Sequence, residues 1–343
     1  MAGAASLLSG CGGSGMVLTP MPRYYVTIAV PGEAVRVTSL PVVVHDSRDG
    51  AVTGSTVVPA PTPAFGADVT GAADDRTFVV GAPEVGAGGK AAYHLFRLLL
   101  SGRGVPGRLT ELRGLAIALG SGWVTGIALS PDGGKLAVAI QGWVPRAPVF
   151  MPFAVIDVVD LRTRQTRSWR SPVTGYWAGA PSWTDRNTTL AFPWWHEAYR
   201  VMIGVDGLIV GFGQLNTAAR HAPLPGTLIA PPVSVLRSVV FAAGNTRGVA
   251  AACQESAAGT AGTISAWTGE ISRADPGRFR VFHTEAEHFI DTRTAAALGS
   301  SCAVLSVDPS GQHALVYGFS FGRLDGAVFT ALPAEDGSSS AAW

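Results

Sequence analysis

The chain is poor in charge and has no long apolar run. Only 14% of its 343 residues are Asp, Glu, Lys or Arg, and no segment concentrates five or six charges of one sign. A surface for nucleic acid needs such a concentration of basic residues, so we expect no nucleic acid partner. No apolar stretch reaches the roughly 20 residues that a membrane-spanning helix requires. We therefore expect a folded body that does not cross a membrane as a helix.

Cysteine is scarce as well, with only Cys11, Cys253 and Cys302 present. Their spacing matches no zinc site, because such ligands come as Cys-x-x-Cys pairs or as clusters with histidine. We expect neither a metal nor a cofactor. If Cys11 carries a lipid, Cys253 and Cys302 could form a disulfide in an oxidising compartment, and two buried free thiols are the alternative.

The first 23 residues read as a disordered segment. Within it, Leu8-Ser9-Gly10-Cys11 resembles the bacterial lipobox, the tetrapeptide whose cysteine is acylated, and Gly12 to Gly15 would form a flexible tether. The seven residues before the tetrapeptide are short for an apolar signal region and include no Lys or Arg. The resemblance implies an extracytoplasmic lipoprotein, anchored to the membrane at Cys11 by lipid alone. A cytoplasmic protein is the alternative.

What the chain does contain is turn residues and short apolar runs. Its 43 glycines and 23 prolines are scattered between stretches of Val, Thr, Ala and Phe, which favours many short strands over helices. The segment 124–140 has the most regular pattern, with an apolar run, then Ser130-Pro131-Asp132-Gly133-Gly134, then a second apolar run. Pro presets the turn and Asp-Gly tolerates left-handed backbone, so this segment predicts a β-hairpin.

The same pattern returns along the chain at intervals of about 50 to 65 residues, close to the one-blade period of a β-propeller. A second strand pair follows several of these hairpins, as at 155–169, which makes four strands per unit. We predict an all-β fold, a propeller of six four-stranded blades at residues 24–333 with a C-terminal tail at 334–343; seven blades remain possible. The other hairpins are expected at 66–81, 181–192, 238–254 and 303–317.

The turn at Ser130-Pro131-Asp132-Gly133 resembles the turn of TolB-like and WD-repeat propellers. The Ala-, Gly- and Arg-rich composition is similar to that of propellers from high-G+C Gram-positive (actinobacterial) species. This resemblance implies the fold, and it leaves the function open because propellers act as scaffolds, ligand binders and enzymes.

No catalytic constellation accompanies the repeats. Gly318 to Gly322 match the pattern G-x-S-x-G, but that motif needs a strand-to-helix elbow and here it lies between two predicted strands. His196-Glu197 lacks the second histidine of a zinc-protease helix, and Gly86 to Lys90 lack the Ser or Thr of a phosphate-binding loop. A non-enzymatic binding protein is favoured, and a propeller hydrolase or lyase with dispersed residues is the less favoured alternative.

The strongest functional signal is a set of aromatic residues in two consecutive loops between second and third strands. In a propeller these loops lie on one rim, and exposed Trp, Tyr and Arg side chains dominate the energetics of protein contacts. We therefore predict a monomer that contacts a protein, a peptide or a cell-envelope ligand through this rim. The predicted contact residues are Trp143, Arg146, Phe150, Trp194, Trp195, His196 and Tyr199.

Overall fold

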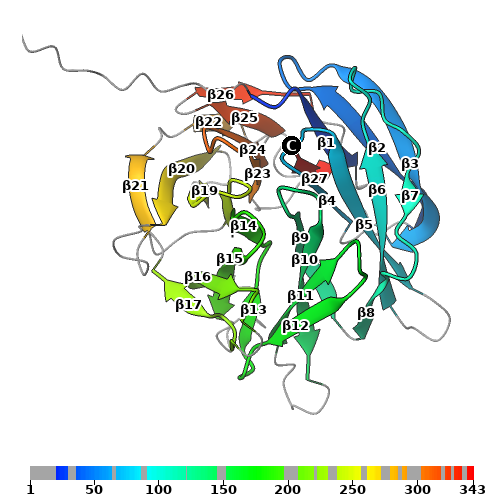
Figure 1. Ribbon diagram of the computed structural model, residues 1–343. Coiled ribbons are helices and arrows are strands. Elements are labelled where there is room, and N and C mark those ends of the chain that lie inside the picture. Colours follow the sequence, from blue (N-terminus) through cyan, green and yellow to red (C-terminus); the bar gives the residue numbers. More distant parts are fainter. Residues whose placement is uncertain are drawn as a thin grey trace, which may run out of the picture.

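The computed structural model is a ring of six antiparallel sheets around a central axis (Figure 1). Its described residues form strands and turns and contain no helix. The six-bladed propeller predicted from the repeats is confirmed, and the alternative of seven blades is wrong. The structure describes residues 21–29, 36–63, 67–85, 91–120, 122–144, 152–196, 208–219, 222–230, 238–255, 261–271, 279–284, 288–291, 303–317, 321–325, 328–333 and 338–343.

Blades 1 to 3 follow one another along the chain, and blade 1 also contains the C-terminal strand. Blade 1 consists of β27 (Ser338–Ala342), β1 (Tyr24–Ala29), β2 (Arg36–Asp46) and β3 (Val52–Pro63). Blade 2 consists of β4 (Asp68–Gly71), β5 (Thr77–Val85), β6 (Ala91–Leu99) and β7 (Thr110–Glu111), with β8 (Ile117–Gly120) also paired to β6. Blade 3 consists of β9 (Trp123–Leu129), β10 (Lys135–Trp143), β11 (Pro152–Asp160) and β12 (Thr166–Arg170).

The remaining blades repeat this order, with the first strand of each nearest the axis. Blade 4 consists of β13 (Tyr176–Ala178), β14 (Ser182–Asp185), β15 (Thr189–His196), β16 (Leu208–Asn216) and β17 (Thr227–Ile229), where β13 and β14 both pair with β15. Blade 5 consists of β18 (Ser238–Phe241), β19 (Arg247–Glu255), β20 (Ala261–Ile271) and β21 (Phe279–Thr284), with β22 (His288–Asp291) on β20. Blade 6 consists of β23 (Ala303–Val307), β24 (His313–Tyr317), β25 (Phe321–Asp325) and β26 (Val328–Ala331).

Local turn chemistry explains the hairpin between the two inner strands of each blade. In the turn after β9, the N–H of Gly133 donates to the carbonyl of Ser130 at 2.8 Å, and Gly133 has a φ of 69°. The carboxylate of Asp132 accepts the N–H of Gly134 at 2.9 Å. Gly244 and Gly311 occupy left-handed positions in the corresponding turns of blades 5 and 6. We call the end of the ring with these turns the lower face, and the opposite end the upper face.

The apolar core is divided among the blades. Six clusters of buried side chains lie between neighbouring sheets, one for each junction around the ring. Between blades 3 and 4, for example, Ile156 of β11 and Phe192 of β15 are both fully buried. Because a single blade cannot cover both of its apolar faces, each junction depends on the blades at its two sides.

Hydroxyl groups join the inner strands around the axis. An inner strand has one edge without a strand partner, and at four places among the described residues its backbone N–H donates to a Ser or Thr of an adjacent blade instead. These side chains satisfy buried backbone donors and link neighbouring blades. The donors and acceptors are Val69 N to Ser340 Oγ (3.0 Å), Leu129 N to Thr70 Oγ1 (2.9 Å), Phe241 N to Ser182 Oγ (3.1 Å) and Trp343 N to Ser306 Oγ (3.3 Å).

The ring closes through the last strand of the chain, which corrects one expectation. We expected a tail at 334–343. Instead, Ser338–Ala342 form β27 and pair antiparallel with β1, while the preceding strands β25 and β26 complete blade 6. The physical reason is that β1 needs an inner partner to cover its edge, and β27 supplies it.

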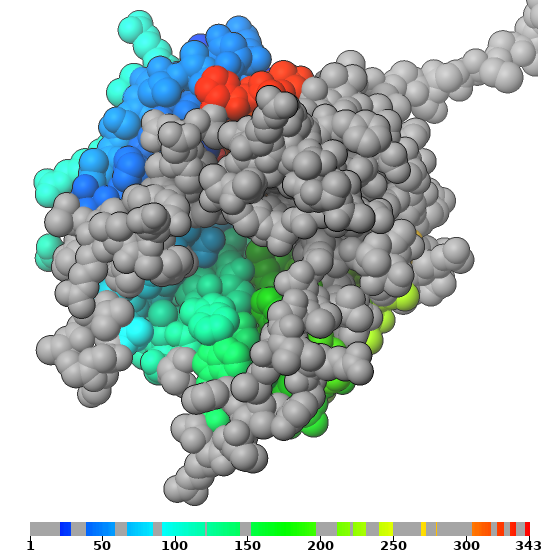
Figure 2. Space-filling view, turned by 180° about the vertical axis from the view of Figure 1, so that it is seen from behind, coloured from blue at the N-terminus to red at the C-terminus, as the bar shows by residue number. Residues whose placement is uncertain are grey.

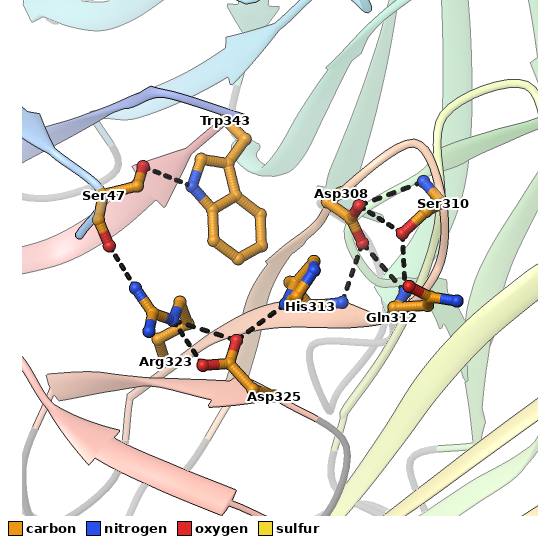
Figure 3. Close-up of polar contacts among 8 residues, drawn as sticks. All are labelled: Ser47, Asp308, Ser310, Gln312, His313, Arg323, Asp325 and Trp343. Atoms are coloured by element: carbon orange, nitrogen blue, oxygen red, sulfur yellow. Dashed lines mark hydrogen bonds and ion pairs between the residues drawn. The ribbon is translucent and has the colours of Figure 1, made fainter. Parts of the chain in front are cut away.

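A polar network fastens blade 6 to blade 1 at this closure (Figure 3). The indole N–H of Trp343, which follows β27, donates to Ser47 Oγ at 3.1 Å. Arg323 of β25 donates to the carbonyl oxygen of Ser47 and, through Nε, to Asp325 Oδ2 at 2.7 Å. Nδ1 of His313 lies 2.7 Å from Asp325 Oδ1. The network therefore joins blade 6 to blade 1 through groups that are buried (Ser47 and Trp343) or half-buried (His313, Arg323 and Asp325).

Candidate functional site

An aromatic surface lies on the upper face, at the ends of strands in blades 3 and 4. Trp123 begins β9, Trp143 ends β10, Tyr176 and Trp177 lie in β13, and Trp195 and His196 end β15. We call these six residues the aromatic face. Described residues of blades 3 and 4, coloured teal to green, reach the surface in the view from behind (Figure 2).

Blade 3 contributes an edge-on pair of indole rings. The ring centroids of Trp123 and Trp143 are 5.3 Å apart with an interplanar angle of 61°. Trp123 is 48% exposed, which is high for so large an apolar side chain. Its position is set by the antiparallel pairing of β9 with β10, in which it lies opposite Gln141. The pair thus presents indole surface from a rigid sheet.

Blade 4 contributes two further aromatic layers on opposite sides of its sheet. The rings of Trp177 and Trp195 stack at 4.9 Å with an angle of 17°, and the ring of Tyr176 lies 4.7 Å from that of His196. His196 is exposed, and both tryptophans are half-buried. The indole N–H of Trp195 is buried and has no acceptor among the described residues, so ring packing rather than hydrogen bonding holds this pair.

Backbone contacts hold these two groups of aromatic residues next to each other. The hydroxyl of Thr125 in β9 donates to the carbonyl of Ala178 in β13 at 2.7 Å. The N–H of Gly175, just before β13, donates to the carbonyl of Pro152 at 2.8 Å. Because both contacts cross from blade 3 to blade 4, they fix the position of β13 relative to the strands of blade 3.

The contact residues predicted from the sequence fall into three groups. Trp143, Trp195 and His196 belong to the aromatic face. Trp194 is only 3% exposed and stacks on Tyr176 at 5.5 Å in the core between blades 3 and 4, because alternate residues of β15 point to opposite sides of the sheet. It is therefore a core residue rather than the surface contact that we expected. Arg146, Phe150 and Tyr199 lie outside the described residues.

The cysteine predictions are untested. Cys253 lies in β19 opposite Ile264, but its side chain, Cys302 and Cys11 are outside the part of the chain that the structure describes. The disulfide and the lipid attachment stay predictions. Among the described residues, no group of three or more His, Cys, Asp or Glu side chains is arranged to hold a metal ion. The described part also contains no apolar helix of membrane-spanning length.

Three aromatic residues of the site were missed by sequence reasoning. Trp123, Tyr176 and Trp177 precede or begin inner strands, whereas we searched the loops between second and third strands. Connections that enter an inner strand emerge on the same end of a blade as those loops. The signal was therefore available as an aromatic residue just before the predicted strands at 124 and 181.

Two other features of the fold lack the properties of a binding or catalytic site. The cavity on the axis has a volume of only about 80 Å³, which accommodates a few water molecules and no organic ligand. His313 and Asp325 form a pair like the histidine and aspartate of a catalytic triad, but no Ser, Thr or Cys hydrogen-bonds to Nε2 of His313 in the described part of the chain. Asp325 also pairs with Arg323, so this network serves the closure of the ring.

One carboxyl group near the upper face has an altered acidity. Asp68 begins β4, and its Oδ2 accepts a hydrogen bond from the hydroxyl of Tyr93 at 3.2 Å. Burial raises the pKa of Asp68 to about 6, although the hydrogen bond from Tyr93 lowers it. The group can therefore change its charge near neutral pH, but its hydroxyl partner Tyr93 is a poor nucleophile, because burial raises the pKa of that phenol well above its usual value. The chemistry available at the upper face is ring stacking and hydrogen bonding.

Comparison with known proteins adds no activity. No family model matches the sequence, and no curated protein matches it. The periplasmic gluconolactonase of Pseudomonas aeruginosa is 16% identical with a TM-score of 0.43, over 92% of this chain and 97% of that one. The β-propeller domain of the trilobed protease from Pyrococcus furiosus is 13% identical with a TM-score of 0.37, over 78% and 71%. An oligogalacturonate lyase in complex with manganese is 13% identical with a TM-score of 0.44, over 89% and 78%. At these identities and scores the likenesses carry no argument about function, and the propeller architecture rests on the sheet order and ring closure described above.

Proposed function

We propose that this propeller is a partner-binding protein whose aromatic face contacts a peptide or protein ligand. The observation that carries the proposal is the exposed indole of Trp123, held against Trp143 at one edge of an aromatic surface spanning two blades. Large aromatic side chains at a rigid surface supply much contact area at little cost in conformational entropy. Exposed aromatic surface of this kind is typical of contact sites.

The composition of the face also supports a binding role. It combines flat rings with the exposed imidazole of His196 and has no Asp, Glu, Lys or Arg among its six members. Interface centres are depleted in charge and enriched in Trp and Tyr, which is the composition found here. A cell-envelope glycan, which also stacks on aromatic rings, is the alternative ligand.

The experiment is to pan a phage-displayed peptide library on the purified protein and to titrate the enriched peptides. We expect Trp123→Ala to weaken binding by about 30-fold, as expected for a hot-spot residue that loses ~2 kcal/mol. The matched control is Leu228→Ala, because Leu228 is also 48% exposed but lies on the outer strand β17. We expect the control to bind within twofold of the wild type.

The outcomes separate the ligand classes. Peptides that bind wild type and Trp123→Ala equally would reject the aromatic face as the peptide site. If the library yields no binder and the protein binds a glycan array in a way that Trp123→Ala abolishes, the aromatic face is a glycan site and not a peptide site. Turnover of ester, peptide or glycan substrates by the purified protein would instead support the hydrolase or lyase alternative.

The location of the protein is a separate proposal. The lipobox-like sequence around Cys11 supports anchoring at the outer face of the cell membrane. We expect the wild type to be found in the membrane fraction and to incorporate labelled fatty acid, and Cys11→Ser to lose both properties. A wild-type protein that is unlabelled and remains inside the cell would support the cytoplasmic alternative.

A further inference from the structure

A groove lies on the outside of the ring, where blade 2 meets blade 3. Its volume of about 730 Å³ is within the range of small-molecule sites. Five apolar side chains line it, of which Phe96 and Leu109 are buried and Leu112 is half-buried. We call this cavity the outer groove. Its apolar lining is Phe96, Leu109, Leu112, Leu115 and Leu161.

The acidic groups of the outer groove are already paired. Glu84 Oε2 lies 2.7 Å from Nε2 of His94, and Glu111 Oε1 lies 3.3 Å from Nδ1 of the same ring. Arg113 Nε lies 3.7 Å from the other oxygen of Glu111. The two nitrogens of His94 thus face separate carboxylates, so the three residues do not converge on one point as metal ligands would.

Two arginines of the groove have no such partner. Arg108 and Arg164 line the same cavity, and neither has an acidic partner within ion-pair distance among the described residues. Arg164 comes from the turn between β11 and β12 in blade 3, whereas Arg108 comes from blade 2. The groove therefore carries unpaired positive charge on both of its sides.

The turn between β11 and β12 sets the direction in which the side chain of Arg164 leaves blade 3. The φ of Arg164 is 62°, a left-handed conformation that Gly or Asn adopts more readily than Arg. Asp160 holds the turn by accepting the N–H groups of Arg162 at 3.0 Å and Thr163 at 2.7 Å. Across the junction, Nη1 of Arg164 lies 3.8 Å from the position that a Cβ on Gly114 would occupy. The turn therefore lets the guanidinium of Arg164 extend from blade 3 toward blade 2, where it lines the groove.

We propose that the outer groove binds a small organic anion, with a carboxylate or phosphate monoester between Arg108 and Arg164 and an apolar body over the leucines. Guanidinium groups bind both anions through paired N–H donors. Leu112, Leu115 and Leu161 would remove the apolar part of the ligand from water. This site is separate from the aromatic face and does not depend on the function proposed for it.

Octyl phosphate, octanoate and octanol are the probes, titrated calorimetrically into the full chain below their micelle concentrations. We expect saturable binding of at least one anion and at least tenfold weaker binding of octanol, which has the same alkyl chain without the charge. The two anions distinguish phosphate from carboxylate as the preferred group. Binding of the anion is also expected to weaken as NaCl is raised, because the charge contact is exposed.

Arg164→Gly tests the site without damaging the turn, since glycine accepts a left-handed φ. We expect at least a tenfold loss of anion affinity with a Tm equal to or above that of the wild type, and a similar loss for Arg108→Gln. The control is Arg103→Gln, because Arg103 is an exposed arginine of blade 2 that does not line the groove. Absence of saturable binding, equal binding of octanol, or full affinity in both groove variants would overturn the proposal.

Discussion

Two tryptophans of adjacent blades differ completely in what surrounds them. Trp183 lies in the inner strand β14, is 1% exposed, and donates its indole N–H to the carbonyl of Ala128 in blade 3 at 3.0 Å. Trp123 begins the inner strand β9 at the upper face and is 48% exposed against the ring of Trp143. The first fills the space between two blades, and the second leaves ring surface available. The same residue type thus holds two blades together at one place and presents exposed ring surface at the other.

The largest expected effect follows from removing the buried member of this comparison. Trp183→Ala leaves a cavity between blades 3 and 4 and an unpaired carbonyl, so we expect a loss of ~3–5 kcal/mol in the free energy of unfolding. Urea denaturation measures it, and Trp183→Phe, which keeps most of the ring volume, should lose less. A loss below ~1 kcal/mol for the alanine variant would contradict the role of Trp183 in the junction.

Removing the carboxylate of Asp308, in the turn of blade 6 on the lower face, should lower the stability nearly as much. Asp308 is fully buried, and its carboxylate accepts the N–H groups of His313 at 2.8 Å, Gln312 at 2.9 Å and Ser310 at 3.1 Å (Figure 3). Asp308→Ala leaves these donors unsatisfied, and we expect a loss of ~2–3 kcal/mol in thermal unfolding experiments. Asp308→Asn keeps an acceptor oxygen and should lose ~1 kcal/mol. Equal stability of wild type and Asp308→Ala would show that water replaces the carboxylate.

The closure of the ring should depend on pH through His313 and Asp325. The hydrogen bond that His313 donates to Asp325 raises the pKa of His313, although burial opposes it. Burial would raise the pKa of Asp325, but the hydrogen bonds from His313 and Arg323 lower it. The histidine contribution is complete below its unfolded pKa of ~6.5 and is lost as pH rises through the higher folded value. The aspartate contribution is present above ~3.9 and is lost as pH falls through the lower folded value.

The directions of the two pKa shifts predict that the closure contributes most to stability between about pH 4 and 6.5. His313→Gln should therefore cost ~1 kcal/mol near pH 5.5, the contribution expected of a partly exposed hydrogen bond. The difference from the wild type should shrink as pH is raised toward 9. Melting temperatures of both proteins across this range measure it, and a difference that does not change with pH would exclude the charged form of His313 from the closure.

The smallest expected effect on stability is at the exposed member of the comparison. Trp123→Ala should change the free energy of unfolding by less than ~0.5 kcal/mol, because its ring fills no space between blades. Urea denaturation beside Trp183→Ala gives the contrast directly. A loss above ~2 kcal/mol at Trp123 would mean that its ring is structural, and it would remove the basis for a contact surface.

The inner hairpins could be predicted because turn chemistry is local. Ser130-Pro131-Asp132-Gly133 specifies its turn within four residues, and the structure places β9 and β10 on either side of it. The closing strand could not be predicted in this way. Ser338-Ser339-Ser340 followed by two alanines has no strand preference of its own, and its order comes from pairing with β1 at the other end of the chain.

Only part of the candidate site could be predicted, because the exposure of a side chain also depends on residues that are distant in the chain. Period-two alternation says that Trp194 and Trp195 point to opposite sides of β15, but it does not say which side remains exposed. Trp194 packs on blade 3 because Tyr176 covers it there, and Trp195 stacks on Trp177 on the side facing blade 5. Arg108 and Arg164, which lie more than fifty residues apart in the chain, share a groove only after blades 2 and 3 meet.

The sequence by itself determined the strand repeats, the turn types and hence a propeller, because these depend on residues close together in the chain. Tertiary structure alone decided the strand that closes the ring, which aromatic rings are buried, and which charged groups remain unpaired. Each of these depends on which surfaces neighbouring blades cover, and burial between blades is a property of residues that are distant in the chain.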